Sequence, residues 1–269
     1  MHVFLTSATG YVGAAVAARL QVHGHSVAAL ARSVASEERL RSVGIRPVPG
    51  NLARPETYRD EAASADAVAH TAFEYSADGA ENLDLDLQAT RTLLHARRLI
   101  YTSNAYRPRI EVERLLASAT SAAAIRVGMV YGGCGGGTIA SLFTAARRSG
   151  HLPYLREAAT YRWSLIHLDD LAQLYARLLE TKVTGVFNGV DGQPLSVRRT
   201  LERAAAVCGV SASMKDEAFV TSVHEQHTVD VMKHDVALDS SEARALDWSP
   251  HYRSFEEGAA AAYAEWCVQ

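Results

Sequence analysis

An α/β fold, a doubly wound parallel sheet with a small C-terminal lobe, is predicted by three features of this sequence. Short apolar runs alternate with segments of helical periodicity, which is the pattern of a parallel sheet. The turn Ser7-Ala8-Thr9-Gly10-Tyr11-Val12-Gly13 joins the first apolar run to the first helix. The 269 residues are enough to bury a full core. We expect one domain, with its core at residues 1–131 and 163–190 and the lobe at residues 132–162 and 191–269.

Each element is predicted from its own residues and from the signals at its ends. Apolar runs bounded by turn residues predict strands, and a glycine such as Gly24 or Gly44 after a periodic segment ends a helix. Pro55 favours the first turn of a helix. The predicted strands are Val3–Thr6, Ser26–Ala31, Arg46–Pro49, Ala67–Thr71, Leu99–Ser103, Ala123–Val130, Trp163–His167 and Gly185–Asn188. The predicted helices are Gly10–His23, Ser36–Val43, Pro55–Ser64, Leu85–Ala96, Glu111–Ser118, Thr138–Ser149 and Asp169–Glu180, and helices dominate from Ser196 onward.

The turn from Ser7 to Gly13 predicts a site for the pyrophosphate of a dinucleotide. A tight turn from strand to helix points backbone N–H groups and the positive end of the helix dipole at one place. Gly10 would let the backbone approach the phosphates, and Gly13 would let the helix pack closely on the strand. Ser7 stands where the full pattern has its first glycine. An ordinary turn with packing glycines is therefore the alternative.

Composition excludes several classes of function. Lys and Arg number 27 against 30 Asp and Glu, so no broad basic field is present for nucleic acid or a membrane surface. No apolar run is long enough to span a bilayer, and a strand that begins at residue 2 or 3 leaves no room for a signal peptide. The three cysteines are far apart, which indicates a reducing compartment. We expect a cytoplasmic protein that acts on a small molecule, and a homodimer is left open.

No metal site is predicted from the spacing of the histidines. His224, His227 and His234 lie near acidic residues, but their spacing does not match a helical zinc pair. A solvated segment is the better interpretation.

Several further motifs follow the first turn in a fixed order. They are Val3–Gly13, Ala31-Arg32-Ser33, Tyr101-Thr102-Ser103, Ile125–Gly132, Ile166–Ala172, Val186–Gly189 and Ala243–Pro250. This set resembles the extended and atypical short-chain dehydrogenases/reductases, the NAD-dependent epimerase/dehydratase-like proteins. The resemblance implies a Rossmann-type core, a C-terminal substrate lobe and a dinucleotide across the carboxyl ends of the strands. In addition to the turn residues, it nominates Leu52, Thr71, Ala72 and Val130 for cofactor binding.

The second strand predicts which cofactor is preferred. NAD sites place an acid about 20 residues after the glycines, on the ribose hydroxyls. Here that region reads Leu30-Ala31-Arg32-Ser33 and has no acid. Arg32 would clasp a 2′-phosphate and Ser33 would donate to it, so we expect NADP, with NAD as the alternative. Asn51 stands where the family has an Asp near the adenine, and a turn at Gly50-Asn51 is an equal interpretation.

The catalytic set departs from the family. The resemblance implies a Ser/Thr, Tyr and Lys after the fifth strand, yet Tyr-x-x-x-Lys is absent. Asn104 occupies the hydroxyl position that follows Ser103, and an amide donates to a developing alkoxide without relaying a proton. Arg109 falls at the Lys position, and Tyr106 is one residue out of register. We nominate Asn104, Tyr106 and Ser103 for catalysis and Arg109 for cofactor binding; simple packing is the alternative for Tyr106.

Two segments are shorter than in the family. A helix that ends at Ala96 leaves almost no turn before the strand at Leu99, although about 2–6 residues are usual. Few residues remain between Asn104 and Arg109, where the family has a longer segment with the Tyr. We expect residues to be missing near Ala96-Arg97 and Tyr106–Arg109, through a deletion or through omission of a loop with the Tyr and Lys.

The predicted function is hydride transfer, dependent on NAD(P), to or from a carbonyl or enone of a small, polyketide-like substrate. The substrate is expected between the core and the lobe. Two alternatives stay open. One is epimerisation or dehydration of a nucleotide sugar, and the other is a non-catalytic NADP sensor that keeps the pocket but lacks the acid.

Overall fold

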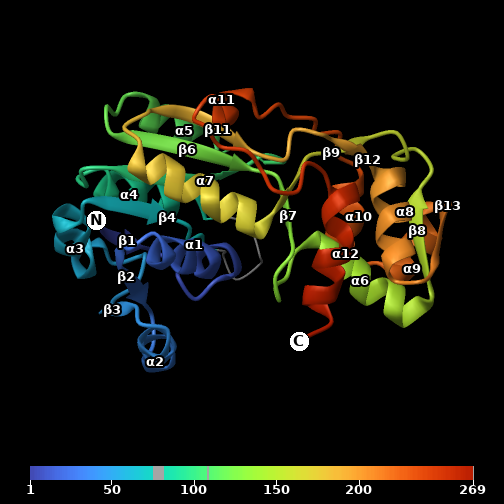
Figure 1. The fold of residues 1–269 in the computed structure, drawn as a ribbon, viewed down its shortest axis with the longest axis horizontal. Coiled ribbons are helices and arrows are strands. Elements are labelled where there is room, and N and C mark those ends of the chain that lie inside the picture. Colours follow the sequence, from blue (N-terminus) through green and yellow to red (C-terminus); the bar gives the residue numbers. More distant parts are fainter. Residues whose placement is uncertain (75–81, 108, 269) are drawn as a thin grey trace. The chain divides into compact units, whose positions relative to one another are not determined.

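A computed structural model describes residues 1–74, 82–107 and 109–268 and divides the chain into two compact units (Figure 1). The first unit comprises residues 1–126 and 172–187, and the second comprises residues 127–171 and 188–269. The first unit therefore ends before residue 131, where the predicted core ended, and resumes after residue 163.

The first unit is built on a seven-stranded sheet with the order β11-β6-β5-β4-β1-β2-β3. The pairs β1–β2, β2–β3, β1–β4 and β4–β5 are parallel. The strand order reverses between β1 and β4, which is the place where sheets of this kind bind ligands. The predicted doubly wound α/β fold is confirmed. The strands are β1 (His2–Leu5), β2 (Ser26–Ala31), β3 (Arg46–Pro49), β4 (Ala67–His70), β5 (Leu99–Asn104), β6 (Ala122–Val127) and β11 (Gly185–Gly189).

Helices cover both faces of this sheet, with α1 and α7 on one face and α4 and α5 on the other (Figure 1). Two buried rows of strand side chains explain this arrangement. Val3 and Leu5 face the opposite way from Phe4, and all three are fully buried. The helices are α1 (Tyr11–Val22), α2 (Val34–Ser42), α3 (Arg59–Ser64), α4 (Leu83–Leu93), α5 (Ile110–Ala117) and α7 (Leu168–Glu180), with a 3₁₀ turn, η1, at Pro55–Thr57.

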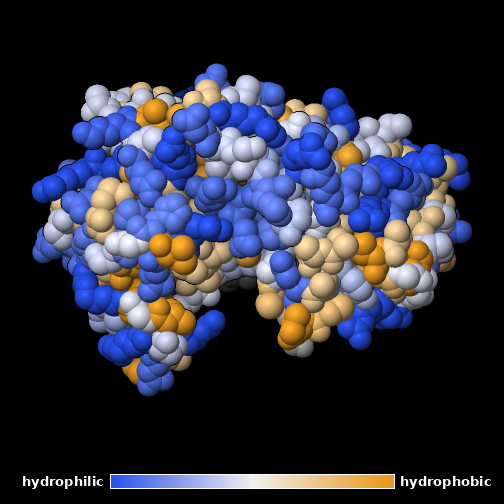
Figure 2. All heavy atoms as spheres, in the orientation of Figure 1, coloured by the Kyte–Doolittle hydropathy of each residue, from blue (hydrophilic) through white to orange (hydrophobic). Residues whose placement is uncertain are grey.

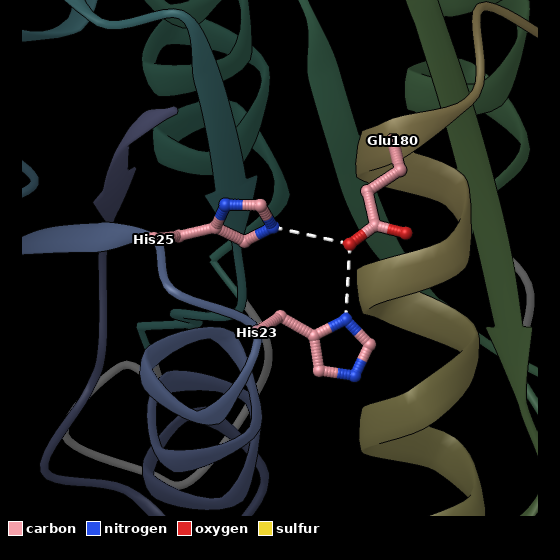
Figure 3. Close-up of side chains that lie close together, drawn as sticks. All are labelled: His23, His25 and Glu180. Atoms are coloured by element: carbon pink, nitrogen blue, oxygen red, sulfur yellow. Dashed lines mark hydrogen bonds and ion pairs between the residues drawn. The ribbon is translucent and has the colours of Figure 1, made fainter.

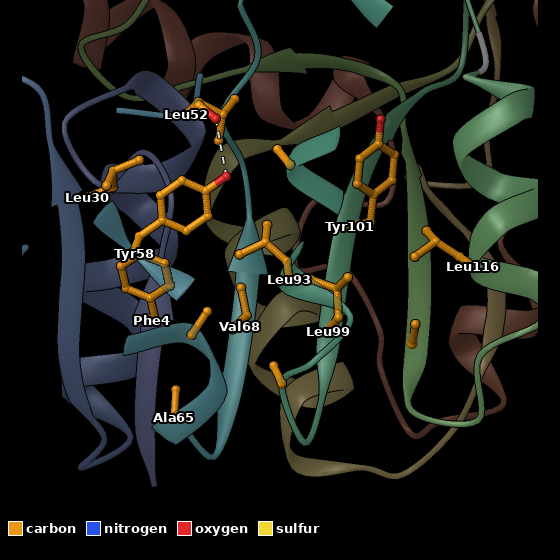
Figure 4. Close-up of a cluster of buried hydrophobic side chains, with 14 of the residues drawn as sticks. Phe4, Leu30, Leu52, Tyr58, Ala65, Val68, Leu93, Leu99, Tyr101 and Leu116 are labelled. Atoms are coloured by element: carbon orange, nitrogen blue, oxygen red, sulfur yellow. Dashed lines mark hydrogen bonds between the residues drawn. The ribbon is translucent and has the colours of Figure 1, made fainter. Parts of the chain in front are cut away.

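The main core of the first unit lies under α3, α4 and α5 (Figure 4). Phe4, Val68 and Leu99 project from β1, β4 and β5, and each has no exposed surface. Leu93 of α4 and Leu116 of α5 close over them. Full burial of such side chains stabilises the fold by about 1.5–3 kcal/mol each. This core fixes the strand ends that carry the candidate site.

Two helix boundaries correct the predictions. Helix α2 begins at Val34 rather than Ser36, because the Ser33 side chain accepts the Ser36 N–H and caps the helix. Helix α4 ends at Leu93 rather than Ala96, and the Ala96 N–H donates to the Leu93 carbonyl at 3.0 Å in the turn that follows. Residues 94–98 therefore form a turn of ordinary length before β5. The predicted shortage of residues near Ala96-Arg97 was wrong, because α4 ends three residues earlier than predicted.

The second unit contains three short strand pairs and a set of helices. Strands β7 (Met129–Tyr131) and β10 (Leu165–His167) are parallel, as are β8 (His151–Leu155) and β13 (Ser211–Lys215), whereas β9 (Arg162–Trp163) and β12 (Leu195–Ser196) are antiparallel. The helices are α6 (Thr138–Ser149), α8 (Val197–Val207), α9 (Glu217–Val223), α10 (Gln226–Met232), α11 (Ser241–Arg244) and α12 (Phe255–Trp266).

Glycine 128 divides what the sequence predicts as one strand at Ala123–Val130. A Cβ atom at Gly128 would lie 2.6 Å from the Ser164 carbonyl oxygen, so the backbone of the β9–β10 segment packs directly against this residue. The chain leaves the large sheet there and continues as β7. Strands β8 and β13 were also not predicted, because the polar run Ser211–Lys215 has no strand pattern of its own.

No helix among the described residues is long and apolar enough to cross a membrane. Hydrophilic and hydrophobic residues are interspersed on the face drawn in Figure 2. Large exposed hydrophobic side chains such as Val22, Val34 and Val268 are single residues in different parts of the chain, which is ordinary for a protein surface.

Candidate dinucleotide site and the end of the fifth strand

The turn between β1 and α1 has the close packing that the sequence predicts for a dinucleotide site. A Cβ atom at Gly13 would lie 1.6 Å from the Ser7 carbonyl oxygen and 2.9 Å from Thr71 Oγ1, so glycine is required there. Gly10 is the N-cap of α1, and no side chain caps the helix. The first turn of α1 also lacks acidic residues. An anionic pyrophosphate therefore fits this turn.

Thr6 connects this turn to the residues that follow β4. Its Oγ1 accepts the N–H groups of Thr71 at 3.1 Å and of Ala72 at 3.0 Å. Thr71 and Ala72 are both predicted cofactor residues, and the structure brings them beside β1. Thr6 itself is buried and was not predicted as a site residue, because the predicted pyrophosphate turn begins at Ser7.

A buried network continues from Thr6 into the core. Thr6 Oγ1 lies 2.9 Å from His70 Nδ1, and His70 Nε2 lies 3.1 Å from Asp86 Oδ1. Tyr101 donates its hydroxyl proton to the other oxygen of Asp86. Because Thr6 Oγ1 already accepts two N–H groups, its proton goes to His70 Nδ1, and His70 donates from Nε2. Burial raises the pKa of Tyr101, and the negative charge of Asp86 raises it further, so this phenol stays protonated.

Arg32 and Ser33 lie at the end of β2, as predicted, but each already has a partner. Arg32 Nη1 donates to Glu74 Oε1 at 3.0 Å, and 68% of the Arg32 side chain is exposed. Such an exposed ion pair contributes about 0–1 kcal/mol, so a phosphate can replace Glu74 as the partner. The Ser33 hydroxyl accepts the Ser36 N–H at 3.2 Å and caps α2. Glu74 was not predicted, since it follows β4 and not β2.

The turn after β3 holds Asn51 and Leu52. Asn51 Oδ1 accepts the Ala53 N–H at 2.7 Å, which is the turn role that the sequence left open. Its amide NH₂ end is the group that remains to face an adenine. The Leu52 side chain is 2% exposed and packs in the core, beside the Tyr58 hydroxyl that donates to the Leu52 carbonyl (Figure 4).

Asn104 ends β5 and shapes the backbone after it. Asn104 Oδ1 accepts the N–H groups of Tyr106 at 2.7 Å and of Arg107 at 3.1 Å. The oxygen of the amide is therefore engaged in the turn, and the NH₂ end is the donor that Asn104 has to offer. Tyr106 is half-buried in the same turn.

Ser103 is placed differently from Asn104. Its side chain is 1% exposed, and its hydroxyl donates to Glu113 Oε1 at 2.6 Å. Glu113 in turn pairs with Arg126 at 2.6 Å. Burial by itself raises the pKa of Glu113, but the hydrogen bonds from Arg126 and Ser103 outweigh burial, so the pKa is lowered. Ser103 therefore holds β5 against α5 and β6. Glu113 and Arg126 were not predicted as its partners, because neither belongs to a motif that implies them.

Arg109, at the family's Lys position, is fixed at the same strand end. Its Nη1 donates to the Thr102 carbonyl at 2.8 Å, and its guanidinium lies 3.5 Å from the centre of the Phe73 ring. Thr102 Oγ1 donates to the His70 carbonyl at 2.7 Å and accepts from the Tyr175 hydroxyl at 2.6 Å. Burial raises the pKa of Tyr175. Arg109 thus places a guanidinium, which has hydrogen-bond donors and no acceptor, at the end of β5.

Val130 belongs to β7 of the second unit, where it pairs with Ile166. Its contact with a cofactor stays a prediction. Residue 108 is not among the described residues and lies within the segment that the sequence predicts to be shortened. The predicted shortage near Tyr106–Arg109 therefore falls partly outside the described residues.

Known proteins resemble this chain in sequence and in fold. The model of the NAD dependent epimerase/dehydratase family matches residues 3–128. An uncharacterized protein of Saccharomyces cerevisiae is 27% identical over 217 residues, which cover 69% of this chain and 72% of that protein. The 4-hydroxy-2-methyl-3-oxo-4-farnesyl-3,4-dihydroquinoline-1-oxide ketoreductase of Stigmatella aurantiaca is 33% identical over 100 residues, which cover 36% of this chain and 30% of that enzyme.

Among solved structures, the UDP-glucose 4-epimerase of Thermus thermophilus, in complex with NAD, superposes with a TM-score of 0.78. Its sequence is 17% identical, and the superposition covers 99% of each chain, so this likeness establishes the fold. Together with the family match over residues 3–128, it confirms the predicted resemblance: the chain is related in sequence to the NAD dependent epimerase/dehydratase family and has the fold of that epimerase.

Proposed function

We propose that this chain is an NAD(P)-dependent oxidoreductase that transfers hydride to or from a carbonyl or enone of a small molecule. The observation that carries the proposal is the turn at Ser7–Gly13, which is closed by Gly13 and joined through Thr6 to the end of β4. The partial match to a ketoreductase supports a carbonyl substrate. The polyketide-like character of that substrate rests on the sequence analysis alone.

The side chains at the end of β5 divide the work of such a reaction. A bound nicotinamide cofactor supplies the hydride chemistry. The Asn104 NH₂ group donates a hydrogen bond to the substrate oxygen, where negative charge develops during reduction. Arg109 provides a fixed positive charge beside Thr102 and binds ribose hydroxyls. Tyr106 then donates the proton, since the Tyr101 and Tyr175 phenols are buried and have raised pKa values.

Turnover with a panel of ketones and enones tests this assignment. NADPH consumption by the carbonyl panel is followed by absorbance. UDP-sugars are included because a 4-epimerase shares the fold, and their products are separated by chromatography, since epimerisation consumes no net cofactor. Asn104→Ala and Tyr106→Phe should each lower kcat by about 10²-fold or more, with a smaller change in cofactor affinity. Tyr161→Phe in the second unit is the matched control and should leave kcat unchanged. If both variants have the kcat of wild type, Asn104 and Tyr106 take no part in the mechanism.

The preference for NADP is tested at Arg32. We expect wild type to bind NADPH more tightly than NADH. Arg32→Asp should reverse that order, because an arginine pairs with the 2′-phosphate of NADPH whereas an aspartate accepts hydrogen bonds from the ribose hydroxyls of NADH. Glu74→Gln should strengthen NADPH binding, since it releases the Arg32 guanidinium. Arg39→Asp, on the exposed face of α2, is the charge-matched control. Equal affinity of wild type for the two cofactors would show that Arg32 does not select.

A non-catalytic NADP sensor is the second candidate, and two observations favour it. Tyr-x-x-x-Lys is absent, and both of the buried phenols near Arg109 have raised pKa values. A sensor retains the dinucleotide turn without an acid. Calorimetry that shows stoichiometric NADPH binding, combined with no turnover over the whole panel, supports the sensor. Turnover that Tyr106→Phe abolishes supports the oxidoreductase.

A further inference from the structure

Two histidines and a glutamate meet at the opposite end of the sheet from the dinucleotide turn. His23 Nδ1 lies 3.0 Å and His25 Nε2 lies 3.2 Å from the same oxygen, Oε1 of Glu180 (Figure 3). The three candidate ligand atoms all lie within 4.8 Å of one another. All three residues belong to the first unit. Because His23 and Glu180 are 157 residues apart, no spacing motif in the sequence reveals this cluster.

The turn between α1 and β2 sets the positions of both rings. Gly24 has a φ of +77°, its N–H donates to Gln21 O at 2.9 Å, and the His25 N–H donates to Leu20 O at 3.0 Å. This pair of bonds is a Schellman motif, which ends α1 with a fixed geometry. His23 and His25 flank the glycine, and Figure 3 shows both rings directed at the carboxylate at the end of α7. The three groups are therefore oriented before any ligand arrives.

The cluster is accessible to a small ion from solvent. The side chains of His23 and Glu180 are each 33% exposed, and that of His25 is 10% exposed. His25 also lines an open hollow together with Gln21, Ser26 and Gly44. On the far side of its ring, His25 Nδ1 lies 3.4 Å from the amino nitrogen of Met1. An ion can therefore enter with part of its water shell.

The donor set matches the preferences of zinc-class ions. Zn²⁺ is bound by imidazole nitrogen and carboxylate oxygen at about 2.0–2.2 Å, which separates tetrahedral ligand atoms by about 3.4 Å. The two nitrogen-to-oxygen distances, 3.0 and 3.2 Å, are already close to that separation. Only the two ring nitrogens must adjust, by small rotations. In each ring the proton moves to the opposite nitrogen, so that the nitrogen facing Glu180 becomes a ligand. In His25 that opposite nitrogen is Nδ1, so the Met1 amino group that now lies 3.4 Å from it has to turn aside.

We propose that His23, His25 and Glu180 form a site for a divalent transition metal ion of the zinc class. Water completes the coordination on the exposed side. The ion replaces the two hydrogen bonds that now join the rings to Glu180. It fastens the α1–β2 turn to the last residue of α7, which makes it a structural site, independent of the proposed hydride transfer.

Titration of the full, tag-free chain with Co²⁺ tests the proposal. Binding is followed by the visible absorption of the bound ion, and Zn²⁺ is then added as a competitor. We expect one saturable equivalent, displaced by Zn²⁺, and a rise in thermal midpoint. His23→Ala should weaken binding at least about tenfold, since loss of even an outer partner of a metal ligand costs that much. Glu180→Gln should weaken it similarly, while the amide oxygen still accepts both ring protons.

Two control substitutions locate the site. His95→Ala removes an exposed histidine elsewhere in the first unit, and His2→Ala removes a ring that pairs with Glu61 near the same hollow. Both variants should bind Co²⁺ as wild type does. The proposal is overturned if wild type shows no saturable equivalent, or if Glu180→Gln, with an unchanged metal-free thermal midpoint, binds Co²⁺ as tightly as wild type. Loss of binding in His2→Ala alone would also overturn it.

Discussion

At the scale of single residues, the candidate site depends on backbone approach as much as on side-chain chemistry. Gly13 has no room for a methyl group, because the Ser7 carbonyl lies where a Cβ atom would be. Thr6 and Asn104 act in a comparable way, since each uses a side-chain oxygen to accept two backbone N–H groups. These contacts determine where the backbone of the candidate site lies, so we expect substitutions at these residues to displace it.

Gly13→Ala is the sharpest test at this scale. The added methyl group forces the Ser7 carbonyl to move, and overpacking of this kind costs about 1–3 kcal/mol of stability. We expect a lower free energy of unfolding in urea. We also expect the folded variant to bind NADPH more weakly than wild type, because the turn itself is displaced. Gly136→Ala is the control, because a Cβ atom there meets no atom within 4 Å. Unchanged NADPH affinity in Gly13→Ala would separate this turn from the cofactor.

At the scale of elements, caps and turns decide where each helix starts and which groups it presents. Ser33 caps α2 with a reciprocal pair of bonds to Ser36, and this position also follows Arg32. The cap stabilises α2, and we predict that the same position also contacts a 2′-phosphate. The N-cap further directs the first backbone N–H groups of α2 toward the end of β2.

Ser33→Ala separates these two roles. Loss of the cap should lower the free energy of unfolding by about 1 kcal/mol. If Ser33 also donates to the phosphate, NADPH affinity falls while NADH affinity stays the same. Ser42→Ala, which removes a hydroxyl bonded to Arg39 O within the same helix, is the control and should change stability by less than about 0.5 kcal/mol. An equal fall in both affinities would assign Ser33 to the helix alone.

At the scale of the whole molecule, a buried acid makes stability depend on pH. Asp191 has no exposed surface, and burial raises its pKa to about 7. Its Oδ1 accepts the Gln193 N–H at 2.9 Å, whereas Oδ2 has no partner in the part of the chain that the structure describes. The folded pKa lies above the unfolded value of about 3.9. The folded state therefore binds the proton more tightly, and stability falls as pH rises from about 4 to about 7.

Asp191→Asn should remove this dependence. The amide oxygen still accepts the Gln193 N–H, and no charge has to be buried. The stability of the variant relative to wild type should thus increase between pH 5 and pH 7, by at most about 1.4 kcal/mol per pH unit. Urea unfolding at several pH values measures it. Asp235→Asn is the control, because Arg162 lowers the pKa of Asp235 and its titration lies below this range. A relative stability that declines toward pH 7 would contradict the assignment.

The sequence by itself determined the fold class, the tight turn between β1 and α1 and the bounds of elements such as β2, β3 and α6. These features are local: apolar periodicity, a terminal glycine or a strand–turn–helix order is complete within a few residues. The end of α4 was missed because its last turn carries no glycine or proline, and Gly128 gave no sign that it divides a strand.

Only the tertiary structure decided the partners of the predicted side chains. Arg32 meets Glu74, Ser103 meets Glu113, and Asp86 lies between His70 and Tyr101. The pairing of β8 with β13 and the contact of His23 with Glu180 likewise join residues that are far apart in the sequence. The physical reason is that the energy of a hydrogen bond, an ion pair or a strand pairing depends on distance in space. That distance is set by the packing of the sheet and its helices, and not by separation along the chain.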